Sequence, residues 1–193
     1  MSTTQAILQN QVTNMLALEK HIFQALERQI DSDEVNQNRA ASTLINRMHR
    51  TVNEHVSHLD ALASEYGGNA TVQEAAASFA GSIAGIFDTM RGYTASKALR
   101  DDYTAFSLAA ISYTMLHTTA VALNDARVAN IALAHLKQIT PIITEISETM
   151  PHVIAAGLAE SNPGIALNVN AATVSEEQTQ EAWSSEFLYA ERA

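Results

Sequence analysis

An acidic side chain and a histidine fall on apolar helix stripes, where polar groups are unexpected. Glu19 continues the stripe of the first periodic segment, and His55 interrupts that of the second. A turn near residue 36 places Glu19 opposite residue 53, within one helical turn of His55. A carboxylate inside a bundle is unfavourable unless it is paired or metal-bound. The pair therefore predicts a Glu–His hydrogen bond that fixes helix register or, alternatively, a metal site; a third interpretation leaves both groups in water.

A second pair, His117 and His135, lies on the two later periodic segments. A turn near Asn124 places His117 opposite about residue 132, within one turn of His135, and roughly 9 Å along the axis from Glu19. We interpret both rings as neutral, hydrogen-bonded core imidazoles, with metal binding as the alternative.

The remaining candidate side chains have structural interpretations. His49 and His58 are predicted to lie on the surface, and Tyr103, Phe106 and Tyr113 are predicted core residues. The chain carries no Gly-rich phosphate loop, no HExxH motif and no Ser-His-Asp arrangement on a strand and turn.

Helical periodicity dominates the elements that position these residues. Apolar residues recur three and four apart in four long segments, over residues 4–30, 38–66, 96–123 and 126–158. Residues 71–90 read as a shorter, Ala-rich helix that connects two helical hairpins. The order predicts an all-α, ferritin-like four-helix bundle with a helical crossover and a C-terminal extension, and with its two hairpin turns at opposite ends.

Breaks in the periodicity mark the turns and one boundary. Residues 31–36 predict a turn, Pro141 predicts a kink, and Pro151 predicts an end or a second bend of the last long helix. The Ser-Asn-Pro-Gly stretch separates a helical bundle over residues 1–160 from a tail over residues 161–193. Within this tail, IALNVN alternates apolar and polar residues.

Composition restricts the classes of function. The 193 residues include no Cys, which excludes a disulfide scaffold, a Cys-ligated metal and thiol catalysis. The net charge of −10 disfavours binding to nucleic acid or to anionic membranes. No uninterrupted apolar stretch reaches about 18 residues, so no membrane span is expected. The N-terminus lacks the features of a secretory signal, and we expect a cytoplasmic protein.

The tail carries large apolar side chains outside the predicted bundle: Trp183, Phe187, Leu188 and Tyr189. They can cover the protein's own surface, dock onto a second copy or bind another protein. A segment that follows a flexible hinge is readily exchanged between subunits. We therefore expect a homo-oligomer, with a dimer favoured, or a protein partner bound through the tail.

Three segments of the chain resemble a known family. The stretches LALEKHIFQAL, TVNEHVSHLDAL and SYTMLHTTAVAL look like those of the YciF-like stress-response branch of the ferritin-like superfamily. The likeness covers about residues 10–158. It implies a four-helix bundle, often dimeric, with a two-metal centre.

Such a centre takes a Glu from each of two helices and a Glu-x-x-His motif from each of the other two. Glu19 matches the lone Glu of the first helix, and His55 matches the His of the second. Val52, however, stands where the second helix should carry its Glu. The third helix has Phe106 and Ser107 at its ligand level.

The fourth helix departs further from that pattern. Gln138 and Pro141 lie at the expected level of its motif, and a shift by one turn brings in His135 but leaves Ala132 at the Glu position. At least three of the six ligands are therefore missing. A redox-active metal pair is not expected, although iron or manganese at low occupancy on Glu19, His55 and His135 is the alternative.

These observations favour a non-catalytic ferritin-like bundle that acts by self-association or partner binding, in a stress-related role. Two other functions stay open. One is a residual metal-binding protein of the same fold, and the other is a carrier that holds a small apolar ligand in the bundle interior. A fold alone does not decide between them.

Overall fold

The computed structural model describes residues 3–66 and 94–183, and within these ranges every regular element is a helix. The described helices are α1 (Thr3–Ile30), α2 (Asp33–Gln37), α3 (Arg39–Glu65), α5 (Ala95–Ala122), α6 (Ala126–Ser161) and α7 (Ala171–Trp183). The four long helices occupy the segments that helical periodicity predicted. The predicted crossover over residues 71–90 lies outside the described residues.

Side-chain caps fix where three of the long helices begin. The side chains of Asn38, Thr94 and Asp125 accept hydrogen bonds from backbone N–H groups in the first turns of α3, α5 and α6. Each cap pairs a donor that the helix itself leaves unpaired. Between α5 and α6, Asn124 has a φ of 57°, a left-handed conformation that Asn tolerates, and this allows a very short connection.

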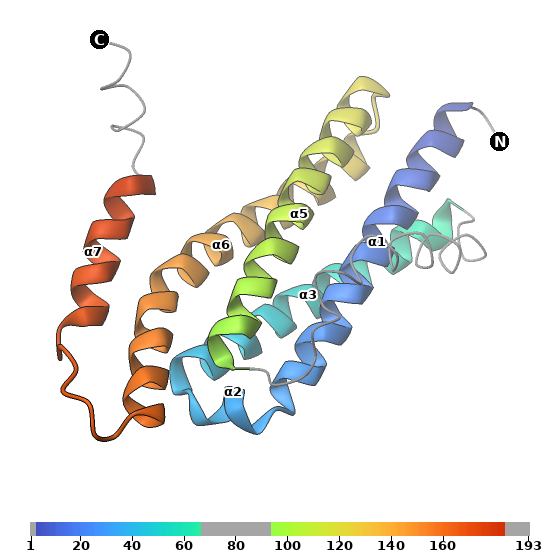
Figure 1. The fold of residues 1–193 in the computed structure, drawn as a ribbon. Coiled ribbons are helices and arrows are strands. Elements are labelled where there is room, and N and C mark those ends of the chain that lie inside the picture. Colours follow the sequence, from blue (N-terminus) through green and yellow to red (C-terminus); the bar gives the residue numbers. More distant parts are fainter. Residues whose placement is uncertain (1–2, 67–93, 184–193) are drawn as a thin grey trace, which may run out of the picture.

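The long helices lie side by side (Figure 1). α1 packs against α3 and α5, and α6 packs against the same two helices, so the four enclose one core. The α1–α3 turn and the α5–α6 turn lie at opposite ends, as the sequence predicted. At the second turn, the Tyr66 hydroxyl donates to Asp125 Oδ2 at 2.5 Å, which ties the end of α3 to the start of α6.

Two local predictions differ from the structure. The predicted turn over residues 31–36 contains the short helix α2. α6 continues through both Pro141 and Pro151 to Ser161 while it curves, so Pro151 does not end it (Figure 1). A proline removes one backbone donor, and packing on both sides compensates for a single missing bond. The alternating IALNVN stretch lies in the loop before α7, which is the helix that the tail forms.

Candidate polar centre of the bundle

Each of the four long helices contributes one polar side chain to the middle of the core. These side chains are Glu19 from α1, His55 from α3, Tyr113 from α5 and His135 from α6. Glu19, His55 and Tyr113 are 0 % exposed and His135 is 3 % exposed. Apolar side chains surround them, so their polar atoms depend on hydrogen bonds to nearby protein groups.

Glu19 is the acceptor at the centre of this group. Its Oε1 accepts a hydrogen bond from the Tyr113 hydroxyl at 2.8 Å and lies 3.1 Å from His55 Nδ1. His135 Nδ1 lies 2.9 Å from the same Tyr113 oxygen. The rings of His55 and His135 stack at a centroid distance of 3.9 Å. One carboxylate oxygen therefore connects residues from all four helices, directly or through Tyr113.

The hydrogen-bond directions assign the proton positions. Because the Tyr113 hydroxyl donates to Glu19, its oxygen accepts from the Nδ1–H of His135. His135 is then neutral, with a lone pair on Nε2. Burial, followed by the charges of His55 and His58, lowers the pKa of His135 to about 3, in agreement with a neutral ring. Burial and the Glu19 charge raise the pKa of Tyr113, so its hydroxyl keeps its proton.

His55 faces an oxygen acceptor from each ring nitrogen. Its Nδ1 points to Glu19, and its Nε2 lies 2.8 Å from the amide oxygen of Gln138. Donation to both oxygens corresponds to the imidazolium form. In that form His55 supplies the positive charge that a buried Glu19 carboxylate requires.

One end of the network reaches the surface. His58 is exposed, and its Nδ1 lies 3.1 Å from His135 Nε2, the lone pair left by the assignment above. The hydrogen bonds thus form a continuous series from exposed His58 through His135 and Tyr113 to Glu19.

The donor set does not fit a two-metal centre. Glu19 is the single carboxylate of the group, and the side chains at the missing positions are the apolar Val52 and Phe106 and the neutral amide of Gln138. Two divalent cations need several carboxylates for charge balance. Among the described residues, no set of three or more histidine and acidic side chains is arranged to hold a metal ion. Glu19 Oε2 is buried there, and no described residue gives it a hydrogen bond.

The predicted candidates are brought together in part. Glu19, His55 and His135 meet at one level, which confirms the Glu19–His55 contact. The predicted pairing of His135 with His117 is wrong, because His135 bonds to Tyr113, one turn earlier on α5. The prediction of His58 as a plain surface residue missed its contact with His135. Gln138 lies at the level expected for a metal ligand of the fourth helix, and this position could have predicted its contact with His55.

A second buried polar pair lies near the other end of α1. Gln29 Nε2 donates to Asp102 Oδ1 at 2.9 Å, and both side chains are buried. Burial raises the pKa of Asp102 to about 8; the Gln29 hydrogen bond lowers it and the charge of Asp101 raises it. The other carboxyl oxygen and the Gln29 Oε1 have no partner among the described residues. A protonated carboxyl is therefore the form that suits this site.

The predicted contact residues of the tail lie at the limit of the described structure. Trp183 is the last residue of α7. Phe187, Leu188 and Tyr189 lie outside the described residues, so their predicted role in partner binding stays a prediction.

Comparison with known proteins adds no relative. No protein-family model, curated protein or solved structure matches the chain. The assignment of function therefore depends on the geometry above.

Proposed function

We propose that this chain is a non-catalytic bundle of the ferritin-like type that works by self-association through an apolar side of α5. The observation that carries the proposal is a group of large apolar side chains on that helix that no described helix covers. The composition of the polar centre supports the non-catalytic part of the proposal.

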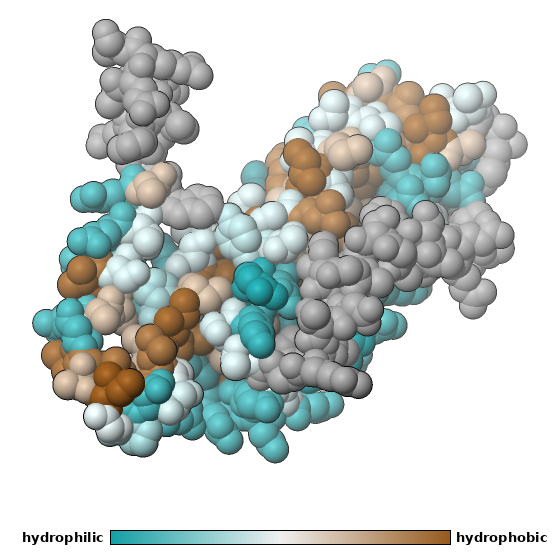
Figure 2. Space-filling view, viewed as in Figure 1, coloured by the Kyte–Doolittle hydropathy of each residue, from teal (hydrophilic) through white to brown (hydrophobic). Residues whose placement is uncertain are grey.

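The apolar side of α5, which we call the α5 face, consists of Ile111, Met115 and Val121. Their exposed fractions are 55 %, 60 % and 55 %. Figure 2 shows brown, hydrophobic residues gathered over the upper part of α5. Ile7 of α1, 42 % exposed, adds a fourth apolar side chain outside the core. Large apolar side chains exposed near one another on a surface are typical of contact sites.

The composition of α5 as a whole also favours a contact surface on this helix. Within the described residues, α5 is the one helix that is long and apolar enough to suit a membrane span as well. Its most apolar stretch of 18 residues has a mean hydropathy of 1.2, and 33 % of that stretch is buried. Asp101 and Asp102 near its start and its packing against α1 and α6 are features of a bundle helix. The unburied share includes the α5 face, for which another copy of the same face is a suitable cover.

The polar centre supports a structural role for the buried acid and histidines. Tyr113 and His55 bond to Glu19 Oε1. The amide oxygen of Gln138 lies against His55 Nε2, and His58 Nδ1 lies against His135 Nε2. Hydrogen bonds that join side chains from all four long helices specify how those helices fit together. The single carboxylate of the polar centre leaves no set of acids for redox chemistry on a metal pair.

Sedimentation velocity over a range of protein concentrations tests the association. We expect the unchanged protein to sediment as a dimer or larger species and Met115→Glu to shift it toward the monomer, because a charge would be buried in the contact. Val169→Glu is the matched control, since Val169 is 94 % exposed in the loop before α7. A protein that is monomeric throughout the range contradicts the proposal, and so does a dimer that survives both Met115→Glu and Ile111→Glu.

Flotation with neutral lipid vesicles separates a membrane from a second copy. If the unchanged protein floats with the vesicles and Met115→Glu does not, the α5 face contacts lipid and the proposal is wrong. If the protein stays with the dense fraction while Met115→Glu dissociates it, the α5 face is a protein contact.

Elemental analysis of protein purified without chelator tests the non-metal part. We expect metal well below one ion per chain, at a level that Glu19→Ala leaves unchanged. Stoichiometric iron or manganese that Glu19→Ala removes would instead establish the residual metal-binding function.

A further inference from the structure

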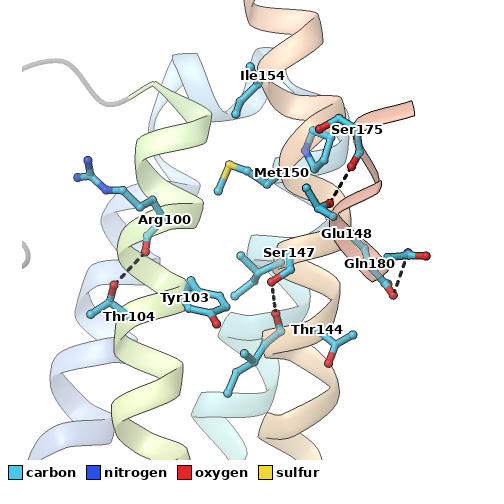
Figure 3. Close-up of a pocket in the computed structure, with 14 residues that line it drawn as sticks. Arg100, Tyr103, Thr104, Thr144, Ser147, Glu148, Met150, Ile154, Ser175 and Gln180 are labelled. Carbon is cyan, nitrogen blue, oxygen red and sulfur yellow. Dashed lines mark hydrogen bonds between the residues drawn. The ribbon is translucent and has the colours of Figure 1, made fainter. Parts of the chain in front are cut away.

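A cavity of about 720 Å³ opens between α5, α6 and α7, outside the core and away from the polar centre (Figure 3). Its origin lies in the packing of α7, which contacts α6 and none of the other described helices. The space between α7 and α5 is therefore left unfilled by the described residues. Cavities of roughly 300–1,000 Å³ are the usual size of small-molecule sites.

The floor of the cavity is apolar. Five apolar residues of α6 line it in steps of one to four: Ile143, Ile146, Met150, Pro151 and Ile154. They span about 16 Å along the helix at 1.5 Å per residue. Figure 3 shows Tyr103 of α5 and Met150 of α6 pointing into the space between their helices. This shape suits an extended aliphatic chain laid along α6.

The charged groups in the walls already have partners. Arg100 donates from both Nε and Nη2 to Asp101 Oδ1, at 2.9 and 2.7 Å. Glu148 accepts from Gln180 at 3.5 Å. A carboxylate on a ligand would find no uncompensated cation here, and it would also meet a protein of net charge −10. An ionised head group is therefore disfavoured.

The hydroxyl groups of the walls favour a hydrogen-bond donor on the ligand. Thr104, Thr144, Ser147 and Thr179 each donate to the backbone carbonyl four residues earlier, so their protons are already used. Each hydroxyl oxygen keeps acceptor capacity. A ligand hydroxyl can donate to them, whereas an acceptor-only group cannot.

We propose that the α5–α6–α7 cavity binds a long-chain aliphatic alcohol, with the chain on the α6 floor and the hydroxyl at the threonine and serine oxygens. His152 Nε2 and Glu176 Oε2, 2.8 Å apart, hold α7 on α6 and so form the wall that closes one side. The site is separate from the α5 face, and this inference does not depend on self-association.

The test is displacement of a neutral fluorescent probe, N-phenyl-1-naphthylamine, from the full chain. We expect 1-dodecanol to displace the probe and dodecanoate to need at least about a tenfold higher concentration, since a buried carboxylate would lack a counter-charge. Ser147→Trp fills the cavity and should weaken probe binding at least about tenfold. Ser57→Trp is the matched control, because Ser57 is an exposed helix residue with the same hydroxyl-to-carbonyl bond.

Thr104→Trp repeats the test from the α5 wall, so a folding defect at one position does not decide the outcome. Absence of displacement by 1-dodecanol overturns the proposal, and so does equal weakening by Ser147→Trp and Ser57→Trp. Binding that emerges only when the chain stops at Trp183 identifies the protein's own last residues as the occupant. A change of mass in solution with Ser147→Trp identifies a second copy. Either result also overturns the proposal.

Discussion

Two buried acids in this bundle have opposite surroundings. Glu19 receives hydrogen bonds from Tyr113 and His55, and the imidazolium form of His55 balances its charge. Asp102 has a single amide partner, Gln29, and burial raises its pKa to about 8. Both carboxyl groups are almost completely shielded from water, with Glu19 0 % and Asp102 1 % exposed.

The difference shows that burial alone does not decide the state of a carboxyl group. Glu19 lies against two hydrogen-bonding groups, Tyr113 and His55, whereas Asp102 has one amide partner, and burial there favours the neutral carboxyl. The contribution of Glu19 to stability then depends on its hydrogen-bond partners, and the contribution of Asp102 depends on pH. The experiments below separate these two dependences.

The largest effect is expected for Glu19→Ala. It removes the shared acceptor and leaves His55 as a buried cation without a counter-charge, so the free energy of unfolding should fall by about 3–5 kcal/mol. Asp102→Asn is the contrasting variant, because Asn keeps a neutral partner for Gln29 and should not destabilise the protein at pH 7. Urea denaturation measures both. Equal losses in the two variants would contradict the distinction between the sites.

The next effect, compared per pH unit, is the pH dependence that Asp102 imposes. Burial raises the pKa of Asp102 from its ordinary value of 3.8 to about 8, so the folded state keeps a proton that the unfolded state releases. The contribution to stability is full below about pH 4 and is lost as pH rises toward 8, by about 1.4 kcal/mol per pH unit. Denaturation midpoints across this range should fall for the unchanged protein and flatten in Asp102→Asn. The same slope in both would rule out Asp102 as its source.

Tyr113→Phe should cost less than Glu19→Ala. It removes one donor to Glu19 and the acceptor for His135 Nδ1 while it keeps the ring in the core. The expected loss is about 1–3 kcal/mol, the usual penalty for unpaired buried polar groups. Tyr103→Phe, a half-buried tyrosine of the same helix, serves as the matched control. Circular dichroism during heating gives the comparison, and a loss no larger than that of the control would weaken the assigned network.

The smallest effect is expected at the exposed end of the network. His58→Ala removes the partner of His135 Nε2, which water can replace, so the loss should stay near or below about 1 kcal/mol. A loss as large as that of Glu19→Ala would mean that His58 belongs to the buried centre rather than to its rim. Chemical denaturation at pH 7 measures the difference.

The sequence predicts the helices better than it predicts the relations between them. Periodic apolar residues located α1, α3, α5 and α6 because each helix buries one stripe. The Glu19–His55 contact followed from a single short turn, which sets the register of two neighbouring helices. The level of His135 did not follow, because it depends on how one hairpin slides against the other. That offset is fixed by packing between α1 and α5 and between α3 and α6.

Two residues of the network also escaped prediction for physical reasons. Tyr113 lies on an apolar stripe like an ordinary core aromatic. Its hydroxyl has a hydrogen-bonding role only because the fold places it opposite Glu19. His58 lies on an exposed face of α3, yet its ring reaches across to α6. A one-dimensional pattern does not contain contacts between faces of different helices.

The short connections at the two ends of the bundle bear on the order of folding. Glu19 and His55 belong to the first hairpin, and Tyr113 and His135 to the second, so each hairpin can assemble from contacts close in sequence. The bonds from Tyr113 to Glu19 and from His55 to Gln138 form only when the hairpins dock. If docking is the late step, Gln138→Leu, which removes only the bond from His55 across the two hairpins, should accelerate unfolding while leaving the refolding rate almost unchanged.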